Sequence, residues 1–442
     1  MSVQEYLEKH LLSRRIEEAV NAAVRAKAPD PVLFIAGHMR RAAVITRVRA
    51  RQILDGHGAP AVEVELHTNK AVHRASAAGA GALEGAAADA AGGSERWKIL
   101  ARVVADAVRV INDKVSEALV GMDPQQQAQI DQAIMDLDKA RHKAELGANA
   151  MLAVSIAACK AGAAEKEVPL YKHIADLVGK SATTLPVPAI TVINGGKHAG
   201  NALPIQEIMI LPVGAKNFEE AMQMGSETYH HLKDIILEKC GSDSCNIGDH
   251  GKKYDLEFKS TKKSGQNFKT ADDMIVIYSQ LCSEYPLVSI EQPFDKDDWE
   301  HSKKLTTLEL CQVAGDDLLM SDPECIKRAV SEYTCNALVL KANQVGTVTE
   351  AIEVVKQAKD AHWGVVVSHR SGDTEDSFIA DLAVGAAAGQ IKTGAPCRGE
   401  CLTKYNQLLR IEEELGSEGV YAGENWRTVE ISGAQDNRSI YG

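Results

Sequence analysis

The sequence predicts an α/β protein in which a helical extension precedes an α+β domain and a parallel βα barrel. Three observations indicate this order. Apolar residues recur at helical spacing near the N-terminus, apolar and polar residues alternate after Ile45, and short apolar runs ending in charged residues recur in the C-terminal half. A chain of 442 residues is long enough for this arrangement. We place the extension at 1–44, the α+β domain at 45–180 and the barrel at 181–442.

The extension contains two predicted helices around a proline-containing turn. Over 1–28 the apolar residues Leu7, Leu11, Ile16, Val20 and Val24 fall three to five apart, and the "APDP" turn then precedes "PVLFIAGHM". Such a segment is either a disordered leader with helical tendency or a dimerising hairpin. The stretch "RRIEEAVNAAVRAKAPDPVLFIAGHM" resembles the docking-and-dimerisation hairpins of the Dpy-30 type, which implies self-association through residues 1–42.

The predicted α+β domain begins with a sheet and continues with helices. Apolar and polar residues alternate from Ile45, and the Gly/Pro-containing stretch 56–60 predicts a turn between antiparallel strands. Residues 77–93 are a low-complexity Ala/Gly segment, which we expect to be a flexible loop. Residues 96–178 are predicted to be helical, including the small-residue stretch "LGANAMLAVSIAACKAGAAE". Two further strands, in "TLPVPAITVINGGKHAGN" and "LPIQEIMILPV", follow this helical region, and a Gly-rich turn follows the first of them.

Composition excludes several classes of protein. The net charge of −12 argues against a nucleic-acid partner, because phosphate backbones are bound by clusters of Lys and Arg. The sequence has no run of 18 apolar residues that would predict a membrane span, and the N-terminus lacks the pattern of a secretory signal. Nine scattered cysteines without a C-x-x-C pair fit free thiols in a reducing compartment. We therefore expect a cytoplasmic protein.

Five short apolar runs in the C-terminal half end in polar residues at nearly constant spacing. The ending residues are Glu291, Asp316, Lys341, His369 and Lys392, which lie 25, 25, 28 and 23 positions apart. Helical stretches fill the intervals, so the runs read as successive βα units of a parallel barrel. Charged residues also end strands simply because loops are exposed to solvent, but that explanation fits one or two strands better than five. In such barrels the reactive residues gather at the strand C-termini.

These residue types together indicate proton abstraction next to a carboxylate. Glu291 and Asp316 offer the oxygen ligands that a hard cation such as Mg²⁺ prefers. A lysine beside a cation loses its proton more easily and can then act as a base. The "SHRSG" stretch of 368–372 provides an imidazole, a guanidinium and hydroxyls, which suit a phosphate group.

From Ile45 to the C-terminus the chain resembles enolase, phosphopyruvate hydratase. The resemblance rests on many specific strings: "LGANAMLAVSIA", "VINGGKHAGN", "QEIMILPVGA", "VSIEQPFDKDDWE", "GDDLL", "LKANQVGT", "SHRSGDTEDSF", "IKTGAPCRGE" and "YNQLLRIEEELG". Among enolases it is most similar to plant-type cytosolic forms with an N-terminal extension. The resemblance implies a homodimer formed mostly through the α+β domain, and a small phosphorylated three-carbon acid as substrate.

The resemblance also implies a role for each matching residue. Lys341 would remove the C2 proton of 2-phosphoglycerate, and Lys392 would neutralise the developing carboxylate charge. Glu291 and Asp316 would be metal ligands for Mg²⁺. The substrate would be bound by His198, Glu207, Ser368, His369, Arg370, Ser371 and Lys392. Glu207 and His250 join Lys341 as catalytic candidates, although alone His198 could serve its own turn and Glu207 could be a solvated strand end.

The sequence departs from the family pattern in ways that bear on activity. His250 stands where the family's Gly-Asp-Glu-Gly-Gly motif has its acid, and "GDHG" runs directly into "KKYDLEFK". One helix–strand unit of the barrel near residue 251, about forty residues with the third metal carboxylate, is therefore expected to be absent. The family's "DSRGNP" is "DGHGAP" around Asp55, and its mobile "SGAST" loop is "GAGAL" at 79–83. Gln292 replaces an aspartate of the family motif.

Two functions remain open from the sequence. The chain is either a Mg²⁺-dependent lyase that interconverts 2-phosphoglycerate and phosphoenolpyruvate with impaired activity, or a non-catalytic enolase-like protein acting as a dimeric scaffold. The retained lysines and carboxylates favour the first. The missing unit, His250 and the Ala/Gly loop favour the second, because a hard cation held by two carboxylates binds weakly and an absent catalytic acid lowers rates ~10²–10⁴-fold.

Overall fold

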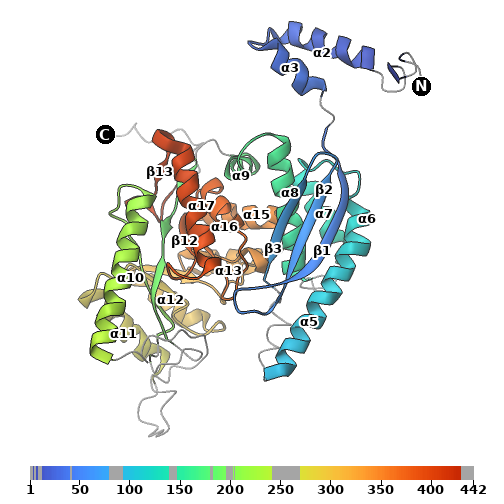
Figure 1. Ribbon diagram of the computed structural model, residues 1–442. Helices are drawn as coiled ribbons and strands as arrows, with labels where there is room; N and C mark the ends of the chain where they lie inside the picture. Colours follow the sequence, from blue (N-terminus) through green and yellow to red (C-terminus); the bar gives the residue numbers. More distant parts are fainter. Residues whose placement is uncertain are drawn as a thin grey trace. The chain divides into compact units, whose positions relative to one another are not determined.

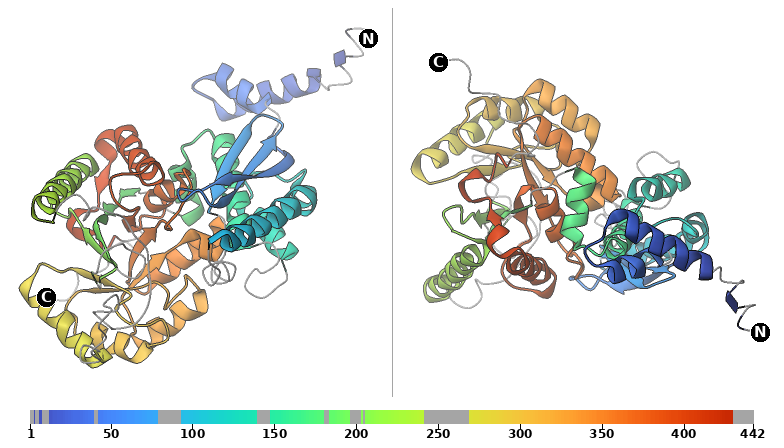
Figure 2. Two further views of the ribbon diagram at one scale, coloured as in Figure 1. Left: turned by 60° about the horizontal axis from the view of Figure 1, so that its bottom comes forward. Right: turned by 90° about the horizontal axis from the view of Figure 1, so that it is seen from above.

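The computed structural model describes residues 3, 6–7, 12–39, 42–78, 93–138, 147–179, 183–195, 203, 205–240 and 269–429. The chain forms two compact units, Met1–Val44 and Ile45–Gly442, and each is described by itself. Figures 1 and 2 show their secondary structure. No helix in the described ranges combines the length and the apolar character that a membrane crossing requires.

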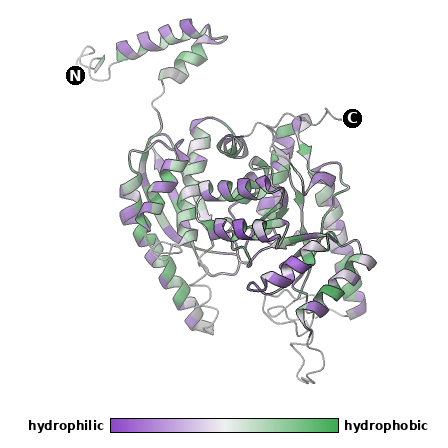
Figure 3. Ribbon diagram, turned by 180° about the vertical axis from the view of Figure 1, so that it is seen from behind, coloured by the Kyte–Doolittle hydropathy of each residue, from purple (hydrophilic) through white to green (hydrophobic). Residues whose placement is uncertain are grey.

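The first unit contains a pair of helices, α2 (Leu12–Ala26) and α3 (Pro31–Met39), on either side of the predicted turn. Helix α2 therefore occupies the C-terminal half of the predicted helix over 1–28. The residues buried in this pair are small, since Ala19 is 0% and Ala23 4% exposed. Larger apolar side chains on α2 and α3 stay in contact with solvent, and the α2 ribbon alternates between hydrophilic and hydrophobic colours in Figure 3.

The second unit begins with an antiparallel three-stranded sheet, as predicted. Its strands are β1 (Ile45–Leu54), β2 (Pro60–Thr68) and β3 (Val72–Ala77), in the order β1-β2-β3. Four helical segments among the described residues pack on this sheet: α5 (Gly93–Val110), the π-helical turn that continues it (Ile111–Val115), α6 (Ser116–Leu119) and α8 (Ala148–Glu165). Helices α7 (Gln127–Leu137) and α9 (Leu170–Val178) pack against α8. Alanines dominate α8 and let it contact neighbours on all sides, so nearly all of its residues are buried.

The remainder forms a curled parallel sheet covered by helices, which confirms the predicted α/β class. The sheet order is β5-β12-β11-β10-β9-β8. These strands are β5 (Val187–Pro188), β8 (Ser289–Glu291), β9 (Gln312–Gly315), β10 (Ala337–Leu340), β11 (Gly364–Ser368) and β12 (Gly389–Lys392). Two short pairs accompany it: β6 (Ile190–Asn194) with β7 (Glu207–Ile210), and β4 (Thr184–Leu185) with β13 (Val420–Tyr421).

The helices of this part alternate with the strands, as the βα interpretation requires. They are α10 (Phe218–Cys240), α11 (Ala271–Glu284), α12 (Trp299–Thr307), α13 (Pro323–Glu332), α14 (Ala342–Val345), α15 (Val348–Asp360), α16 (Phe378–Gly385) and α17 (Gly399–Leu415). Three-residue 3₁₀ turns at Gly416–Glu418 and Gly423–Asn425 flank β13. The stretches 139–146 and 241–268, and with the latter the predicted missing unit, lie outside the described residues.

Residue alternation along the parallel strands creates two apolar faces. Val365 and Val367 of β11 belong to the large core between sheet and helices, whereas Val366 belongs to a small cluster on the inner face with Ala337 and Val339 of β10. This period of two follows from the strand pleat. Because the strands are parallel, all their C-terminal ends lie at the same edge of the sheet, and the residues that end them can meet there.

Candidate active site at the strand ends

The five predicted ladder residues lie at the C-terminal ends of five consecutive strands of one sheet. Glu291 and Lys392 are the last residues of β8 and β12. Asp316, Lys341 and His369 directly follow β9, β10 and β11. In the pairing of β11 with β12, Ser368 stands opposite Lys392. The spacing in the sequence therefore reflected real strand ends, and the parallel pairing brings their side chains to one edge.

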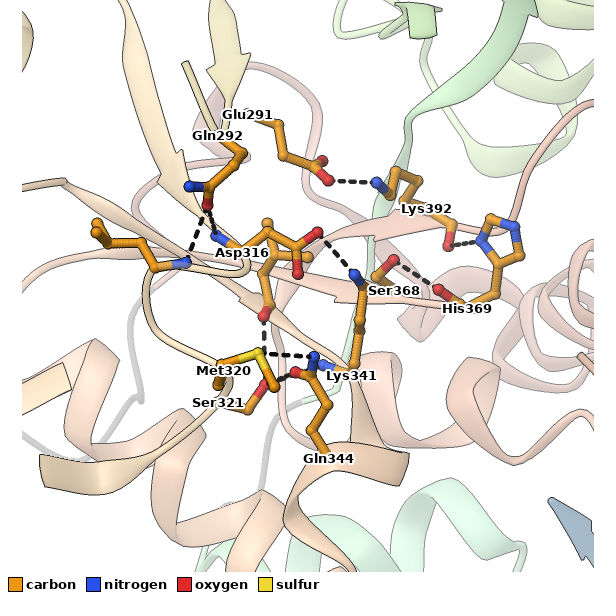
Figure 4. Close-up of polar contacts among 12 residues, drawn as sticks. Glu291, Gln292, Asp316, Met320, Ser321, Lys341, Gln344, Ser368, His369 and Lys392 are labelled. Atoms are coloured by element: carbon orange, nitrogen blue, oxygen red, sulfur yellow. Dashed lines mark hydrogen bonds and ion pairs between the residues drawn. The ribbon is translucent and has the colours of Figure 1, made fainter. Parts of the chain in front are cut away.

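Two ion pairs connect lysines and carboxylates in this site (Figure 4). Lys341 Nζ lies 2.7 Å from Asp316 Oδ2, and Lys392 Nζ lies 2.5 Å from Glu291 Oε1. Glu207, from the start of β7, places Oε2 3.6 Å from the same Lys392 nitrogen. Three carboxylates thus surround two ammonium groups, which leaves one formal negative charge among these five side chains.

Burial and charge act against each other on these groups. Burial disfavours the ammonium of Lys392, but Glu291, Glu207 and Asp316 outweigh it and raise the pKa of Lys392. Burial likewise disfavours the Asp316 carboxylate, yet Lys341 and Lys392 hold the pKa of Asp316 below its usual value. Burial raises the pKa of Glu291, which the Lys392 ammonium opposes.

His369 is held in one orientation by the neighbouring strand. Its backbone N–H donates to the carbonyl of Lys392, and its ring nitrogen Nδ1 lies 2.8 Å from the same carbonyl oxygen. A carbonyl only accepts, so Nδ1 carries the hydrogen and the neutral ring leaves Nε2 as an acceptor. Burial lowers the pKa of His369, which favours this neutral form. The hydroxyl of Ser368 donates to the His369 carbonyl at 2.9 Å.

Beside these groups lies a hollow between the α+β domain and the strand ends. Its lining includes Ser368 at the end of β11, Arg370 and Asp373 from the loop that follows, and Asn343. From the α+β domain it includes Ser76–Ala78 at the end of β3 and side chains of α8. Arg370 therefore faces a space to which both parts of the second unit contribute. Ser371 follows it and is exposed.

The loop 373–376 is bonded to the α+β domain as well as to the barrel. Asp376 accepts hydrogen bonds from Lys160 Nζ at 2.7 Å and from the backbone N–H of Ser76 at 3.1 Å. Ser76 Oγ donates to Thr374 Oγ1 at 2.9 Å. On the barrel side the buried Lys404 of α17 donates to the Thr374 carbonyl at 2.6 Å. This segment, which we call the domain joint, is fixed from both sides directly after the candidate phosphate-binding residues.

The turn between β1 and β2 also reaches this loop. The N–H of Gly56 donates to the Asp373 carbonyl at 3.0 Å, and the His57 ring lies close to Gly372, where φ is +72°. An added Cβ at Gly372 would come within 2.7 Å of His57 Nδ1. Asp55 accepts from the N–H groups of His57 and Ala59, which shapes the turn. The "DGHGAP" departure from the family motif therefore contacts the neighbourhood of the site.

Two carboxylates, those of Asp316 and Glu291, are suited to be ligands of a hard cation. Asp316 Oδ1 is buried and accepts no hydrogen bond from any described residue, and the Glu291 carboxyl contacts the Asp316 carboxylate. Such an unsatisfied oxygen is suited to a Mg²⁺ ligand. A site with more protein ligands is not present in the described ranges, where no group of three or more His, Cys, Asp or Glu side chains could hold a metal ion.

Some predicted site residues fall outside the described ranges. His198, His250 and the 79–83 loop belong to them, so their positions relative to the strand ends stay predictions. Other residues near the site were not singled out by sequence reasoning. Ser321 Oγ accepts from the Lys341 N–H at 3.2 Å and donates to Gln344 Oε1 at 2.9 Å. A polar residue directly after "GDDLLM" gives no signal of such a contact in the sequence.

A small α+β domain next to a parallel βα sheet, with lysines and carboxylates paired at the strand ends, is the arrangement found in barrel proteins of the acid–base type. Comparison with protein families makes this specific. The profile of the enolase N-terminal domain matches residues 45–174, and that of the enolase C-terminal TIM barrel domain matches 182–252 and 250–430. The chain therefore belongs to the enolase family, whose members interconvert 2-phosphoglycerate and phosphoenolpyruvate, generally depend on magnesium and are typically dimers.

Named relatives agree with this assignment. "Cytosolic enolase 3" of Arabidopsis thaliana is 59% identical over 472 residues, covering 97% of this chain and 99% of the relative. "Enolase" of Solanum lycopersicum is 49% identical over 440 residues, covering 87% and 98%. "Enolase 2" of Hevea brasiliensis is 48% identical over 443 residues, covering 88% and 99%.

Two details of these matches concern the unusual parts of the chain. The alignment with the Arabidopsis protein spans 472 positions, although 97% of 442 residues is only about 429, so about 43 positions belong to the relative alone. The barrel profile is interrupted at 250–252, where the sequence predicts a missing unit of about that size. The 97% coverage also means that most of residues 1–44 have a counterpart in the Arabidopsis protein.

Proposed function

We propose that the strand-end site binds 2-phosphoglycerate and carries a weakened enolase reaction. The observation that carries this proposal is the convergence of Lys341 and Lys392 on Asp316 and Glu291 at the ends of β10, β12, β9 and β8 of one sheet. In this interpretation Lys341 accepts the C2 proton, and Lys392 faces the substrate carboxylate. Both lysines are fixed by ion pairs and protrude from strands, so their nitrogen positions are well determined before substrate enters.

The phosphate-binding role belongs to the loop after β11. His369, Arg370 and Ser371 supply an imidazole, a guanidinium and a hydroxyl, and Arg370 lines the hollow. The domain joint immediately follows them and holds their backbone. Ser368 bonds to its own strand end, and Glu207 stays close to Lys392 at the wall of the site. His198 and His250 complete the proposed set from residues 196–202 and 241–268.

Glu291 and Asp316 would hold the magnesium ion, which supplies positive charge next to the substrate carboxylate when bound. The chain itself has two carboxylates for this purpose instead of the family's three. Hard cations with few protein ligands keep more water and bind weakly. We therefore expect a weakened Mg²⁺ site and turnover well below the family's level.

An assay of phosphoenolpyruvate absorbance with and without Mg²⁺ tests the proposal. We expect the purified chain to convert 2-phosphoglycerate at least ~10²-fold more slowly than an ordinary enzyme, whose rates are ~1–10³ s⁻¹. Lys341→Ala should then remove most of this residual rate, because Lys341 is the proposed base. A full rate that Lys341→Ala abolishes would show that some other group has replaced the missing acid and metal ligand.

The second candidate is a non-catalytic enolase-like protein that acts as a dimeric scaffold. The interruption of the barrel profile at 250–252 favours it, because the family's catalytic acid and third carboxylate lie in the region concerned. Binding of 2-phosphoglycerate without any turnover, measured by calorimetry on the same preparation, would support this candidate over the enzyme. Sequencing the transcript across codons 245–260 establishes whether the unit is missing from the expressed protein.

Location and assembly are also proposals. We place the protein in the cytosol, by analogy with the Arabidopsis relative named for that location. We propose a homodimer through the α+β domain, with the α2–α3 hairpin as a second contact to the same partner. In the hairpin Ile16, Val20 and Val24 are 44%, 41% and 71% exposed at four-residue spacing, while Ala19 and Ala23 fill its interior. Two short helices that bury only alanines gain a larger hydrophobic core when the hairpin of a second chain covers the exposed residues Ile16, Val20 and Val24.

A further inference from the structure

Gln292 directly follows Glu291 and occupies an unusual backbone conformation. Its φ is +46°, in the left-handed region that residues with side chains seldom adopt. Its N–H donates to the carbonyl of Ala314 in β9 at 2.9 Å, so the pairing of β8 with β9 continues one residue beyond β8. The chain therefore turns sharply after Glu291 while it remains bonded to the strand that carries Asp316. Strained backbone of this kind persists only where surrounding contacts enforce it.

The side-chain amide of Gln292 makes three hydrogen bonds to main-chain groups. Its Oε1 accepts from the N–H groups of Asp316 and Leu318, each at 3.1 Å. Its Nε2 donates to the Phe294 carbonyl at 2.9 Å. Figure 4 shows the amide oxygen pointing at the loop that follows β9. One amide thus connects its own loop to the neighbouring loop.

These bonds fix the two carboxylates relative to each other. Glu291 is the residue before the amide, and Asp316 receives one of its bonds directly at the backbone. Lys341 is paired with Asp316, and Lys392 is paired with Glu291. Movement of the loop after β9 would therefore shift Asp316 and Lys341 away from Glu291 and Lys392. A displacement of about 1 Å is enough to lower a rate ~10²-fold in a preorganised site.

An amide suits this place better than a carboxylate in this chain. A carboxylate can accept from the two N–H groups, but it cannot donate to the Phe294 carbonyl. It would also add a third negative charge beside Glu291 and Asp316, in a chain with one metal carboxylate fewer than the family. Gln292 supplies the same bridging without that charge.

We propose that Gln292 is a positioning residue that holds Glu291 and Asp316 at a fixed spacing and thereby places Lys341 and Lys392 for substrate. The role for substrate rests on the proposed function, whereas the bridging of the two loops does not. Gln292 acts through its neighbours and need not touch the substrate itself.

The test compares Gln292→Met with Gln127→Met in the full chain. Gln127 in α7 is a matched control, because its buried amide also makes three hydrogen bonds, to Asp131 Oδ1 at 3.0 Å and to the carbonyl and hydroxyl of Ser155 at 3.1 and 3.0 Å. Both variants should lower the melting temperature. Only Gln292→Met should speed amide hydrogen exchange at least tenfold in peptides covering 314–320, and only it should weaken 2-phosphoglycerate binding at least tenfold in calorimetry with Mg²⁺.

Gln292→Glu provides a second variant of nearly the same shape. It keeps the acceptors for Asp316 and Leu318, so exchange in 314–320 should stay close to that of the native chain. The lost donor and the added charge should still weaken 2-phosphoglycerate binding severalfold. This variant keeps the test informative if Gln292→Met does not fold.

The outcomes separate the two proposals. Unchanged exchange in 314–320 for Gln292→Met overturns the bridging role, and faster exchange with unchanged affinity overturns the positioning role. A similar loss of affinity in Gln127→Met also overturns it, because the effect would then be one of general stability. A native chain that binds no 2-phosphoglycerate refutes the proposed function, and hydrogen exchange alone then decides whether Gln292 bridges the loops.

Discussion

Replacing Asp381 with asparagine should stabilise the protein in a way that depends on pH. Asp381 in α16 is 3% exposed, and Gln407 Nε2 donates to its two oxygens at 3.4 and 3.2 Å. The nearby ammonium of Lys160 forms its ion pair with Asp376 instead. Burial is the main cause that raises the pKa of Asp381 to about 7, with the charge of Asp376 adding to it and Lys160 opposing it. The backbone N–H of Tyr171 also bonds to this carboxyl.

The sign and size of the effect follow from linkage. An unfolded aspartate has a pKa of about 3.9, so between about pH 4 and pH 7 the folded protein holds a proton that the unfolded chain has released. Stability therefore falls as pH rises through this window and is constant above it. A difference of about three pKa units corresponds to about 4 kcal/mol at pH 8, of which about 1.5 kcal/mol is already present at pH 5.

The Asp381→Asn variant removes the charge and retains an acceptor for Gln407. We expect its gain in unfolding free energy over the native chain to be about 2.5 kcal/mol larger at pH 8 than at pH 5. Denaturant titrations at several pH values measure this difference, and Asp297→Asn is the control because the Asp297 side chain is 81% exposed. An equal gain at pH 5 and pH 8, or a loss at pH 8, would refute the reasoning that burial of the charge is the dominant effect.

Three further predictions concern the site, the core and the extension. Lys392→Met leaves the buried Glu291 carboxylate without its 2.5 Å partner and should lower the free energy of unfolding by about 3–5 kcal/mol. The double variant that also carries Glu291→Gln should recover part of this loss. Denaturant titration compares the two variants, and no recovery in the double variant contradicts the ion-pair explanation. Thr349→Val removes the hydroxyl that donates to the buried Asp131 at 2.6 Å and should lower the free energy of unfolding by about 1.5–3 kcal/mol, measured by thermal or chemical unfolding. The same change at the exposed Thr307 should alter the free energy of unfolding by less than about 0.5 kcal/mol. Deleting residues 1–44 should leave a dimer in sedimentation velocity, and monomers after this deletion would show that the hairpin alone holds the subunits together.

The strand ends could be predicted because each is a local signal. A short apolar run that stops at a charged residue indicates where a buried strand reaches solvent, and regular spacing indicates that successive strands have the same direction. Glu291, Asp316, Lys341, His369 and Lys392 were found in this way. The alternation after Ile45 likewise predicted the antiparallel sheet, because one face of such a sheet is buried.

Contacts between distant segments could not be predicted by the same reasoning. Lys404 looks like a solvated residue of an amphipathic helix, yet in the structure it is fully buried under the Thr374 carbonyl. Gln292 differs from the family's aspartate by one methylene and by an amide in place of the carboxylate, and its three bonds depend on how two loops approach each other. Polar side chains of this kind form hydrogen bonds with main-chain N–H and C=O groups that secondary structure leaves unpaired. Which groups remain unpaired is known only once the strands and loops are packed.

The domain joint couples substrate binding to the docking of the α+β domain on the barrel. Asp376 and Thr374 are bonded to the α+β domain through Lys160 and Ser76, and they follow directly on the residues proposed to bind phosphate. If docking raises the affinity of that loop for a ligand by some factor, the ligand strengthens docking by the same factor, because coupling free energies are reciprocal. A substitution at Lys160 should therefore change the affinity for 2-phosphoglycerate, although Lys160 is not among the described residues that line the hollow.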